Sequence, residues 1–329
     1  MGKAKINPNM LIWSRHRAGL STGVLAKRVG TPAERLAQWE AGEALPTLRQ
    51  ARLYAEGARV PFGYLYLNEP PADDLPLPDL RTVGDHRVVQ PSLALRETIQ
   101  QVWRRQTWYR EYQQAREADE VPVVGRADIT NDYEAVVADM RSVLAVEVPP
   151  IHRKPEEYLR ELVRRVEATG VLVMRNSIVA NKTREPLSIE DFRGFAIADP
   201  LAPVIFVNTA DVSAAQLFTL LHELTHIWLG ESAISDGDPA TAYKLERFCN
   251  AVAAEFLVPA DGLRVRWDAD IAWESALPAL AGELHASRWA VARRARDLDL
   301  ISDDDYRRYV RRRLGELRNR HNKGPVPYP

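Results

Sequence analysis

The sequence has little cysteine, little net charge and no long apolar run. Cys249 is the one cysteine among 329 residues, which excludes an internal disulfide and a cysteine-rich zinc module. No apolar run approaches the about 20 residues that cross a bilayer, and no apolar stretch follows Lys3 and Lys5 as it would in a secretory signal. These absences predict a cytoplasmic protein in a reducing compartment, without a membrane partner.

The net charge of −1 hides an uneven distribution. Residues 1–70 contain ten Lys or Arg and five Asp or Glu, while residues 307–323 contain eight basic residues and one acid, Glu316. Basic ends on a neutral chain are typical of a protein that binds nucleic acid. Solvated helix faces would account for the same charges, so the distribution alone leaves both interpretations open.

Composition divides the chain into four parts, as expected for a multidomain protein of this length. Apolar residues at helical spacing predict an all-α domain over residues 1–70. Four prolines over residues 69–79 predict a linker, and residues 71–125 combine that linker with a long helix. Residues 126–260 form a predicted α+β core, and residues 261–329 form a helical region with a basic tail.

The long helix predicted over residues 92–118 mixes aromatic and basic side chains. The rings are Trp103, Trp108, Tyr109 and Tyr112, and they lie among Arg104, Arg105 and Arg110. Rings interleaved with arginines can stack on nucleic acid, whereas an apolar helix face packs its rings on a neighbouring domain. Packing is favoured, because Leu95, Ile99, Val102 and Tyr109 already define an apolar face.

The core region predicts a small sheet followed by two helices. Short β-branched or aromatic runs at residues 171–174, 192–198 and 204–207 are bounded by Gly, Asn, Asp or Pro, as strands are. Apolar periodicity then predicts helices over residues 213–229 and 240–257. Either the second or the third strand could form the free edge of the sheet.

The strongest motif in the chain is the H-E-x-x-H run His222-Glu223-Leu224-Thr225-His226. Residues i and i+4 share one face of a helix, so both imidazoles can bind one ion. Glu223 is the predicted catalytic residue, because a carboxylate between the ligands can take the proton of an attacking water. The alternative is that His222 and His226 are core histidines hydrogen-bonded to the backbone.

A third ligand is needed for one Zn²⁺ per chain. Ser232 stands where a longer version of the motif has a third histidine, so a glutamate on the following helix is expected, and Glu246 and Glu255 are the candidates. Glu246 is preferred, because a turn-rich stretch before its helix can bring it back to His226. Asn250 lies one turn further and could hold the second nitrogen of a ligand histidine. Glu255 is expected to be an exposed acid.

These blocks together resemble the ImmA/IrrE family of metallo-endopeptidases. The resemblance rests on Phe218 to His226, on Gly194-Phe195 and Ile205 to Asn208 before them, and on Glu246 to Pro259 after them. It covers about residues 130–260. It implies a zincin core of the thermolysin-like type that acts on repressor-type regulatory proteins.

Residues 1–70 resemble the Cro/repressor (XRE) type of helix-turn-helix domain, on Leu25-Ala26, Gly30, Leu36, Trp39-Glu40 and Gly42. The recognition helix would span about residues 32–41, and a second such arrangement is suggested over residues 277–306. The resemblance implies binding to double-stranded DNA and is compatible with a homodimer. Dimerisation or partner binding is the alternative role of this domain. The candidate DNA contacts are Glu34, Arg35 and Gln38 for bases, and Lys27 and Arg28 for phosphates.

Two functions follow from these features. The first is a zinc endopeptidase fused to a DNA-binding domain, which cleaves a regulatory protein and so controls transcription. The second is a transcriptional regulator or antitoxin that binds DNA and a toxin partner without proteolysis. An intact Glu223 favours the first, since a scaffold that cuts nothing has no need of it.

Overall fold

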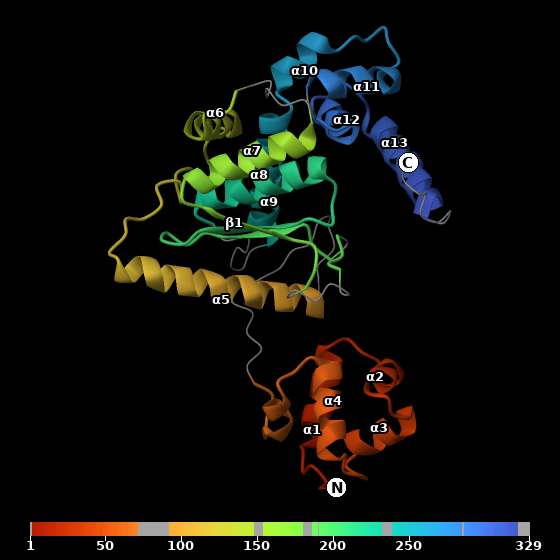
Figure 1. The fold of residues 1–329 in the computed structure, drawn as a ribbon. Helices are drawn as coiled ribbons and strands as arrows, with labels where there is room; N and C mark the ends of the chain where they lie inside the picture. Colours follow the sequence, from red (N-terminus) through yellow and green to blue (C-terminus); the bar gives the residue numbers. More distant parts are fainter. Residues whose placement is uncertain are drawn as a thin grey trace. The chain divides into compact units, whose positions relative to one another are not determined.

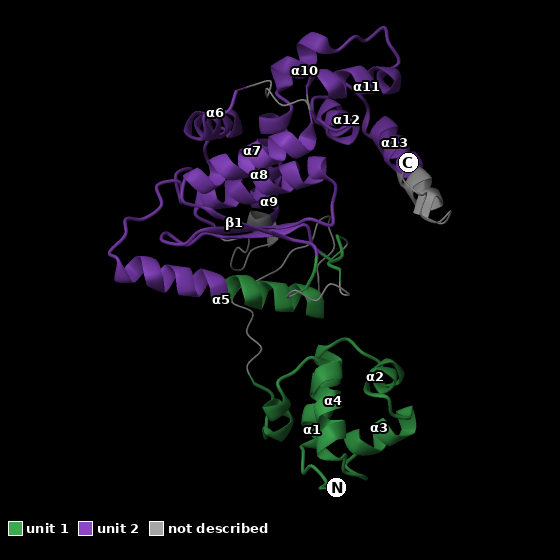
Figure 2. Cartoon of the chain, viewed as in Figure 1, with its two compact units in different colours: residues 1–104, 178–191 green, residues 105–177, 192–329 purple. Residues whose placement is uncertain are grey.

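The computed structural model describes residues 2–71, 92–147, 154–179, 186–189, 191–231, 239–284 and 286–321. Most of the predicted linker and of the turn before the second core helix lie outside these ranges. The chain forms two compact units, residues 1–104 with 178–191 and residues 105–177 with 192–329 (Figure 2). The division falls within the long helix α5 (Leu93–Ala115), between Arg104 and Arg105.

The N-terminal region consists of short helices with well-formed ends. They are α1 (Pro8–Arg17), α2 (Thr22–Val29), α3 (Ala33–Glu40), α4 (Leu48–Ala58) and the 3₁₀ turn Phe62–Tyr66. Ser21 caps α2 by accepting a hydrogen bond from the Val24 amide, and Thr47 and Gln50 form a capping box on α4. These local signals explain why α2 and α4 begin where they do.

A buried polar triad holds α1, α3 and α4 together. The Arg15 guanidinium donates two hydrogen bonds of 2.8 Å to the Glu40 carboxylate. The Tyr54 hydroxyl lies 2.7 Å from the same carboxylate and 2.8 Å from the Leu11 carbonyl oxygen. Burial, followed by the hydrogen bond to Glu40, raises the pKa of Tyr54 far above its usual value. The hydroxyl therefore stays protonated, and the triad is fully satisfied.

Replacing Glu40 by Ala should destabilise this region by about 3 kcal/mol, because it leaves the Arg15 charge and the Tyr54 hydroxyl without their acceptor. Hydrogen–deuterium exchange of the full chain should show faster exchange across α1, α3 and α4. Glu43→Ala is the matched control, since Glu43 is exposed. Equal protection in both variants would contradict a stabilising role for the triad.

The second unit contains a three-stranded sheet. The strands are β1 (Leu172–Asn176), β2 (Gly194–Ile197) and β3 (Val204–Asn208), in the order β1-β3-β2. β3 runs parallel to β1 and antiparallel to β2, and all five of its residues are buried. The suggestion that residues 204–207 form an edge is therefore wrong: β3 is central, and β2 lies at an edge.

Four helices build the layers beside this sheet and place the candidate motif. They are α6 (Tyr133–Leu144), α7 (Pro155–Ala168), α8 (Ser213–Leu229) and α9 (Pro239–Leu257). α7 and α8 pack on the strands, and α9 packs on α8 (Figure 1). α8 ends at Gly230, whose φ of 69° suits glycine and whose absent Cβ leaves room for Gly125. The motif-bearing helix is thus fixed by the core on one side and by a loop at its end.

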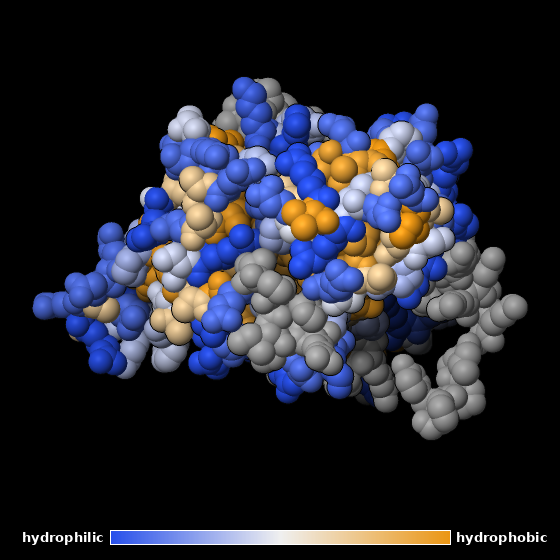
Figure 3. All heavy atoms as spheres, turned by 90° about the horizontal axis from the view of Figure 1, so that it is seen from above, coloured by the Kyte–Doolittle hydropathy of each residue, from blue (hydrophilic) through white to orange (hydrophobic). Residues whose placement is uncertain are grey.

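The C-terminal helices form a further core within the second unit. They are α10 (Ala260–Arg266), α11 (Trp273–Glu283), α12 (Arg288–Asp297) and α13 (Asp303–His321), and their apolar residues cluster around Leu263 and Val291. Hydrophilic side chains cover most of the face drawn in Figure 3, with small hydrophobic patches among them. Within the described ranges, no helix is both long enough and apolar enough to cross a membrane.

The second half of α5 is anchored to the loop before β3. Gln106 donates a hydrogen bond to the Ala202 carbonyl, and Arg110 pairs with Asp199 at 2.8 Å. Trp108 and Tyr112 stack on each other, yet they remain 66% and 44% exposed. These two rings are therefore exposed, whereas Leu95, Ile99 and Val102 of the predicted apolar face are buried.

Candidate metal centre

Three side chains from two neighbouring helices converge on one point. His222 and His226 extend from α8, one helical turn apart, and Glu246 extends from α9. Nε2 of His222 lies 3.3 Å from Nε2 of His226 and 3.3 Å from Glu246 Oε2, while Nε2 of His226 lies 3.5 Å from Glu246 Oε1. The candidate metal-binding group in the described part of the chain is this trio.

The spacing of these atoms fits a tetrahedral zinc ion. Zinc binds imidazole nitrogen and carboxylate oxygen at about 2.0–2.2 Å, so two ligands of a tetrahedral site stand about 3.3–3.5 Å apart. The three observed separations of 3.3 to 3.5 Å agree with that value. The arrangement therefore suits the coordination of one ion, with a fourth position left for water or substrate.

The protonation of the trio His222, His226 and Glu246 favours metal binding. Burial would raise the pKa of Glu246, but hydrogen bonds to both histidines hold it well below its usual value, so the carboxylate is ionised. Burial lowers the pKa of His226 and keeps its ring neutral. Burial also opposes the charging of His222, but its contact with Glu246 and the nearby Glu223 charge raise its pKa. A cation between the rings would replace that proton.

Glu223 lies beside the trio in a buried position. Burial, with a further contribution from the Glu246 charge, raises the pKa of Glu223 to about 7, although His222 opposes the shift. Its Oε2 atom has no hydrogen-bond partner in the described part of the chain. A carboxylate that has one oxygen without a hydrogen-bond partner, and a pKa near neutrality, can accept and return a proton.

Close packing against β2 positions Glu223. A Cβ atom on Gly194 would stand 2.5 Å from Thr219 Cγ2, 2.8 Å from the Phe206 carbonyl oxygen and 3.3 Å from Glu223 Cγ. Only glycine allows the first residue of β2 to approach α8 so closely. Gly194 and Thr219 both belong to the segments that carry the family resemblance, but their close approach is apparent only in three dimensions.

The predicted role of Asn250 is only partly reflected in the structure. A side-chain hydrogen bond in which Asn250 accepts is among the influences that raise the pKa of His222. The Nδ1 atoms of His222 and His226, however, are buried without a partner of ordinary hydrogen-bond geometry among the described residues. The support of the ligand rings by Asn250 stays a prediction.

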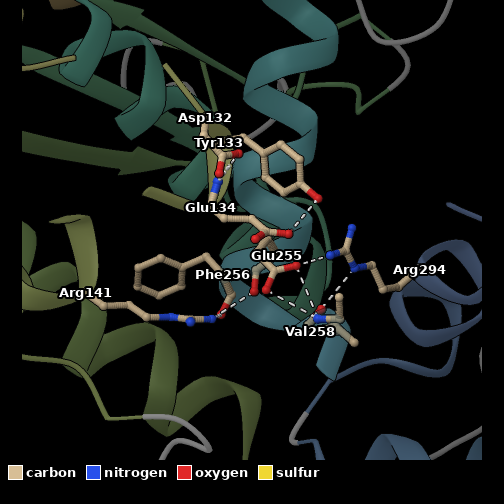
Figure 4. A network of polar contacts seen from close by, with 9 residues as sticks. Asp132, Tyr133, Glu134, Arg141, Glu255, Phe256, Val258 and Arg294 are labelled. Carbon is tan, nitrogen blue, oxygen red and sulfur yellow. Dashed lines mark hydrogen bonds and ion pairs between the residues drawn. The ribbon is translucent and has the colours of Figure 1, made fainter. Parts of the chain in front are cut away.

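Glu255 belongs to a different site, and its prediction as an exposed acid is wrong. It is 9% exposed and forms an ion pair with Arg294 of α12, and its carboxylate accepts a hydrogen bond from the Ala260 amide (Figure 4). Arg294 also donates to the Val258 carbonyl. Arg141 of α6 donates to the Glu255 and Phe256 carbonyls at 2.8 and 2.9 Å. This network joins α6, α9 and α12 at the end of α9.

The candidate DNA contacts lie on neighbouring helices of the first unit. Lys27 and Arg28 are exposed on α2, and Arg35 is exposed on α3 beside the exposed Glu34. The Arg35 guanidinium donates a hydrogen bond of 2.9 Å to the side-chain oxygen of Gln38. These side chains are accessible, and their role in DNA binding stays a prediction.

Comparison with known families supports a metallopeptidase core. Residues 166–296 match the Peptidase_M78 family, described as an IrrE N-terminal-like domain. The match includes β1 to β3, α8 and α9, and most of α12, and it supports the resemblance to ImmA/IrrE proteins. Residues 1–70 lie outside it. No curated protein matches the chain.

Proposed function

We propose that this protein is a zinc-dependent endopeptidase that cleaves a repressor-type regulatory protein and carries a DNA-binding domain at residues 1–70. The observation that carries the proposal is the triangle of His222, His226 and Glu246, whose ligand atoms have the separations of a tetrahedral zinc site. These residues would hold one Zn²⁺ per chain. Zinc in such a site supplies a Lewis acid that lowers the pKa of water to about 7.

Glu223 would transfer the proton during peptide hydrolysis. Its free Oε2 accepts a proton from the attacking water and returns it to the leaving amine. Burial serves this role, because it raises the affinity of the carboxylate for a proton. In this account Glu223 moves protons, whereas the trio holds the metal.

Strand β2 would hold the substrate backbone. In the described part of the chain β2 pairs with β3 alone, and it begins at Gly194, where an added Cβ would meet Glu223. An extended peptide can add to such an edge through main-chain hydrogen bonds. Backbone pairing suits an endopeptidase, because such pairing recognises an extended segment within a chain and does not require a chain end.

Metal analysis and cleavage test this proposal. The purified full chain should contain about one zinc per chain, and it should cut a repressor-type protein encoded beside its own gene. A chelator should abolish the cleavage, and added zinc should restore it. A fully zinc-loaded protein that leaves such partners intact would instead support the regulator or antitoxin function, for which exposed Trp108 and Tyr112 offer a surface to a toxin.

The N-terminal region should bind duplex DNA in a salt-sensitive manner. We expect Arg35→Ala to weaken binding to the protein's own promoter by about 1–3 kcal/mol and to relax preference at one base position. Lys27→Ala is the matched comparison, because loss of a phosphate contact weakens binding to all sequences alike. Fluorescence anisotropy titrations at two salt concentrations measure the affinity of each variant for the duplex. Equal affinity of the unmodified chain for promoter and random duplex would contradict specific binding.

A further inference from the structure

We propose that Arg293 of α12 binds a carboxylate group of the substrate beside the metal centre. This inference rests on the proposed peptidase function, and it adds a substrate class that the family match does not state. It also assigns the C-terminal helices a part in substrate recognition.

A chain of ring contacts connects Arg293 to the metal trio. The Arg293 guanidinium carbon lies 5.4 Å from the centre of the Phe218 ring. The Phe218 ring in turn stacks on His222, with centroids 6.4 Å apart and planes inclined by 30°. Phe218 and His222 are one turn apart on α8, and both are partly exposed while most of that helix is buried. Arg293 therefore lies against a partly exposed ring that itself stacks on the ligand His222.

The N–H groups of Arg293 remain available to a ligand. A guanidinium above an aromatic ring uses its face, and the N–H groups along its edge remain able to bind a carboxylate in a two-pronged geometry. Arg294 pairs with Glu255, and Arg296 pairs with Asp297. Arg293 has neither an ion pair nor a side-chain hydrogen bond among the described residues. Its guanidinium, which lies over Phe218, is therefore available to bind a ligand.

The adjacent residue holds α12 in the orientation that this contact requires. Arg294 is 4% exposed, pairs with Glu255 and donates to the Val258 carbonyl at 3.1 Å. This anchor attaches α12 to the end of α9, the helix that carries Glu246. On the other side, Arg293 lies near the Tyr306 hydroxyl, whose pKa burial raises, so that neighbour brings no negative charge.

The ligand is a carboxylate, either from an Asp or Glu side chain or from a free chain end. Peptide selection distinguishes these two sources. The zinc-loaded full chain with Glu223→Gln is mixed with a random octapeptide library, made once with free and once with amidated C-termini, and the bound peptides are identified by mass spectrometry. The Glu223→Gln change prevents cleavage, so binding is measured independently of catalysis.

We expect about tenfold enrichment of acidic peptides, as a charge-assisted hydrogen-bonded pair would produce. Added Arg293→Ala should abolish this enrichment, and Arg293→Glu should replace it by enrichment of Lys and Arg. If the enrichment persists with amidated peptides, the bound group is the side-chain carboxylate of Asp or Glu. If it requires a free C-terminus, the bound group is the terminal carboxylate. Arg288→Ala, an exposed arginine on the same helix, should leave the selection unchanged.

Zinc content must be equal in all variants, which excludes a merely structural effect of Arg293. Unchanged acidic enrichment in Arg293→Ala, or no enrichment in the parent, would overturn the proposal. Cleavage of a partner protein without any acidic preference would overturn this inference and leave the peptidase function standing. If the chain selects acidic peptides but cleaves no partner protein, the inference stands and the proposed peptidase function is overturned.

Discussion

Glu223→Gln should lower the rate of substrate cleavage by at least about 100-fold and leave one zinc per chain in place, since general acid–base catalysis contributes about 10²–10⁴. The amide keeps the size of the side chain and its place beside Gly194, but it cannot accept the proton at Oε2. Rates come from the cleavage assay, and zinc is measured by elemental analysis of the same sample.

Glutamine at this position also removes a buried group with a raised pKa, so the variant should fold at least as well as the parent. A loss of zinc together with activity would indicate that Glu223 supports the ligands. Full activity in the variant would assign the proton transfer to another group.

Glu246→Ala should release the zinc, whereas Glu255→Gln should retain it. Glu246 brings its two carboxylate oxygens to 3.3 and 3.5 Å from the two histidines, and its removal leaves two ligands, too few for a stable site. Glu255 lies on the same helix, but it is engaged by Arg294 and the Ala260 amide. The pair therefore compares two carboxylates of α9 that differ in location.

Zinc content by elemental analysis and thermal stability with and without a chelator measure both variants. A chelator should lower the melting temperature of the parent and of Glu255→Gln, but not that of Glu246→Ala, because the last has no bound metal to lose. Full zinc occupancy in Glu246→Ala would overturn its assignment as the third ligand.

Local patterns alone predicted the two helices that carry the candidate metal ligands, together with their ends. The expected helix over residues 213–229 coincides with α8, and the expected helix over residues 240–257 differs from α9 by one residue at its start. Apolar periodicity and helix-ending glycines are properties of the chain itself, so they can be read without knowing the partners of each helix. The spacing of His222 and His226 is likewise local, because one helical turn places both on one face.

Contacts between distant segments could not be predicted in the same way. Glu246 and Glu255 have the same chemistry and the same helix, and only the packing of α9 on α8 separates a carboxylate beside the histidines from one that pairs with Arg294. Strand order is also a tertiary property, and it placed β3 at the centre of the sheet.

The sequence by itself therefore determined which residues can do chemistry: two imidazoles one turn apart, a carboxylate between them and glutamates on the next helix. The tertiary structure decided which of those groups meet, which carboxylate is already paired, and that Arg293 lies over the Phe218 ring, which itself stacks on His222. The physical reason is that helix formation depends on neighbours within about four residues, whereas packing depends on surfaces brought together from far along the chain.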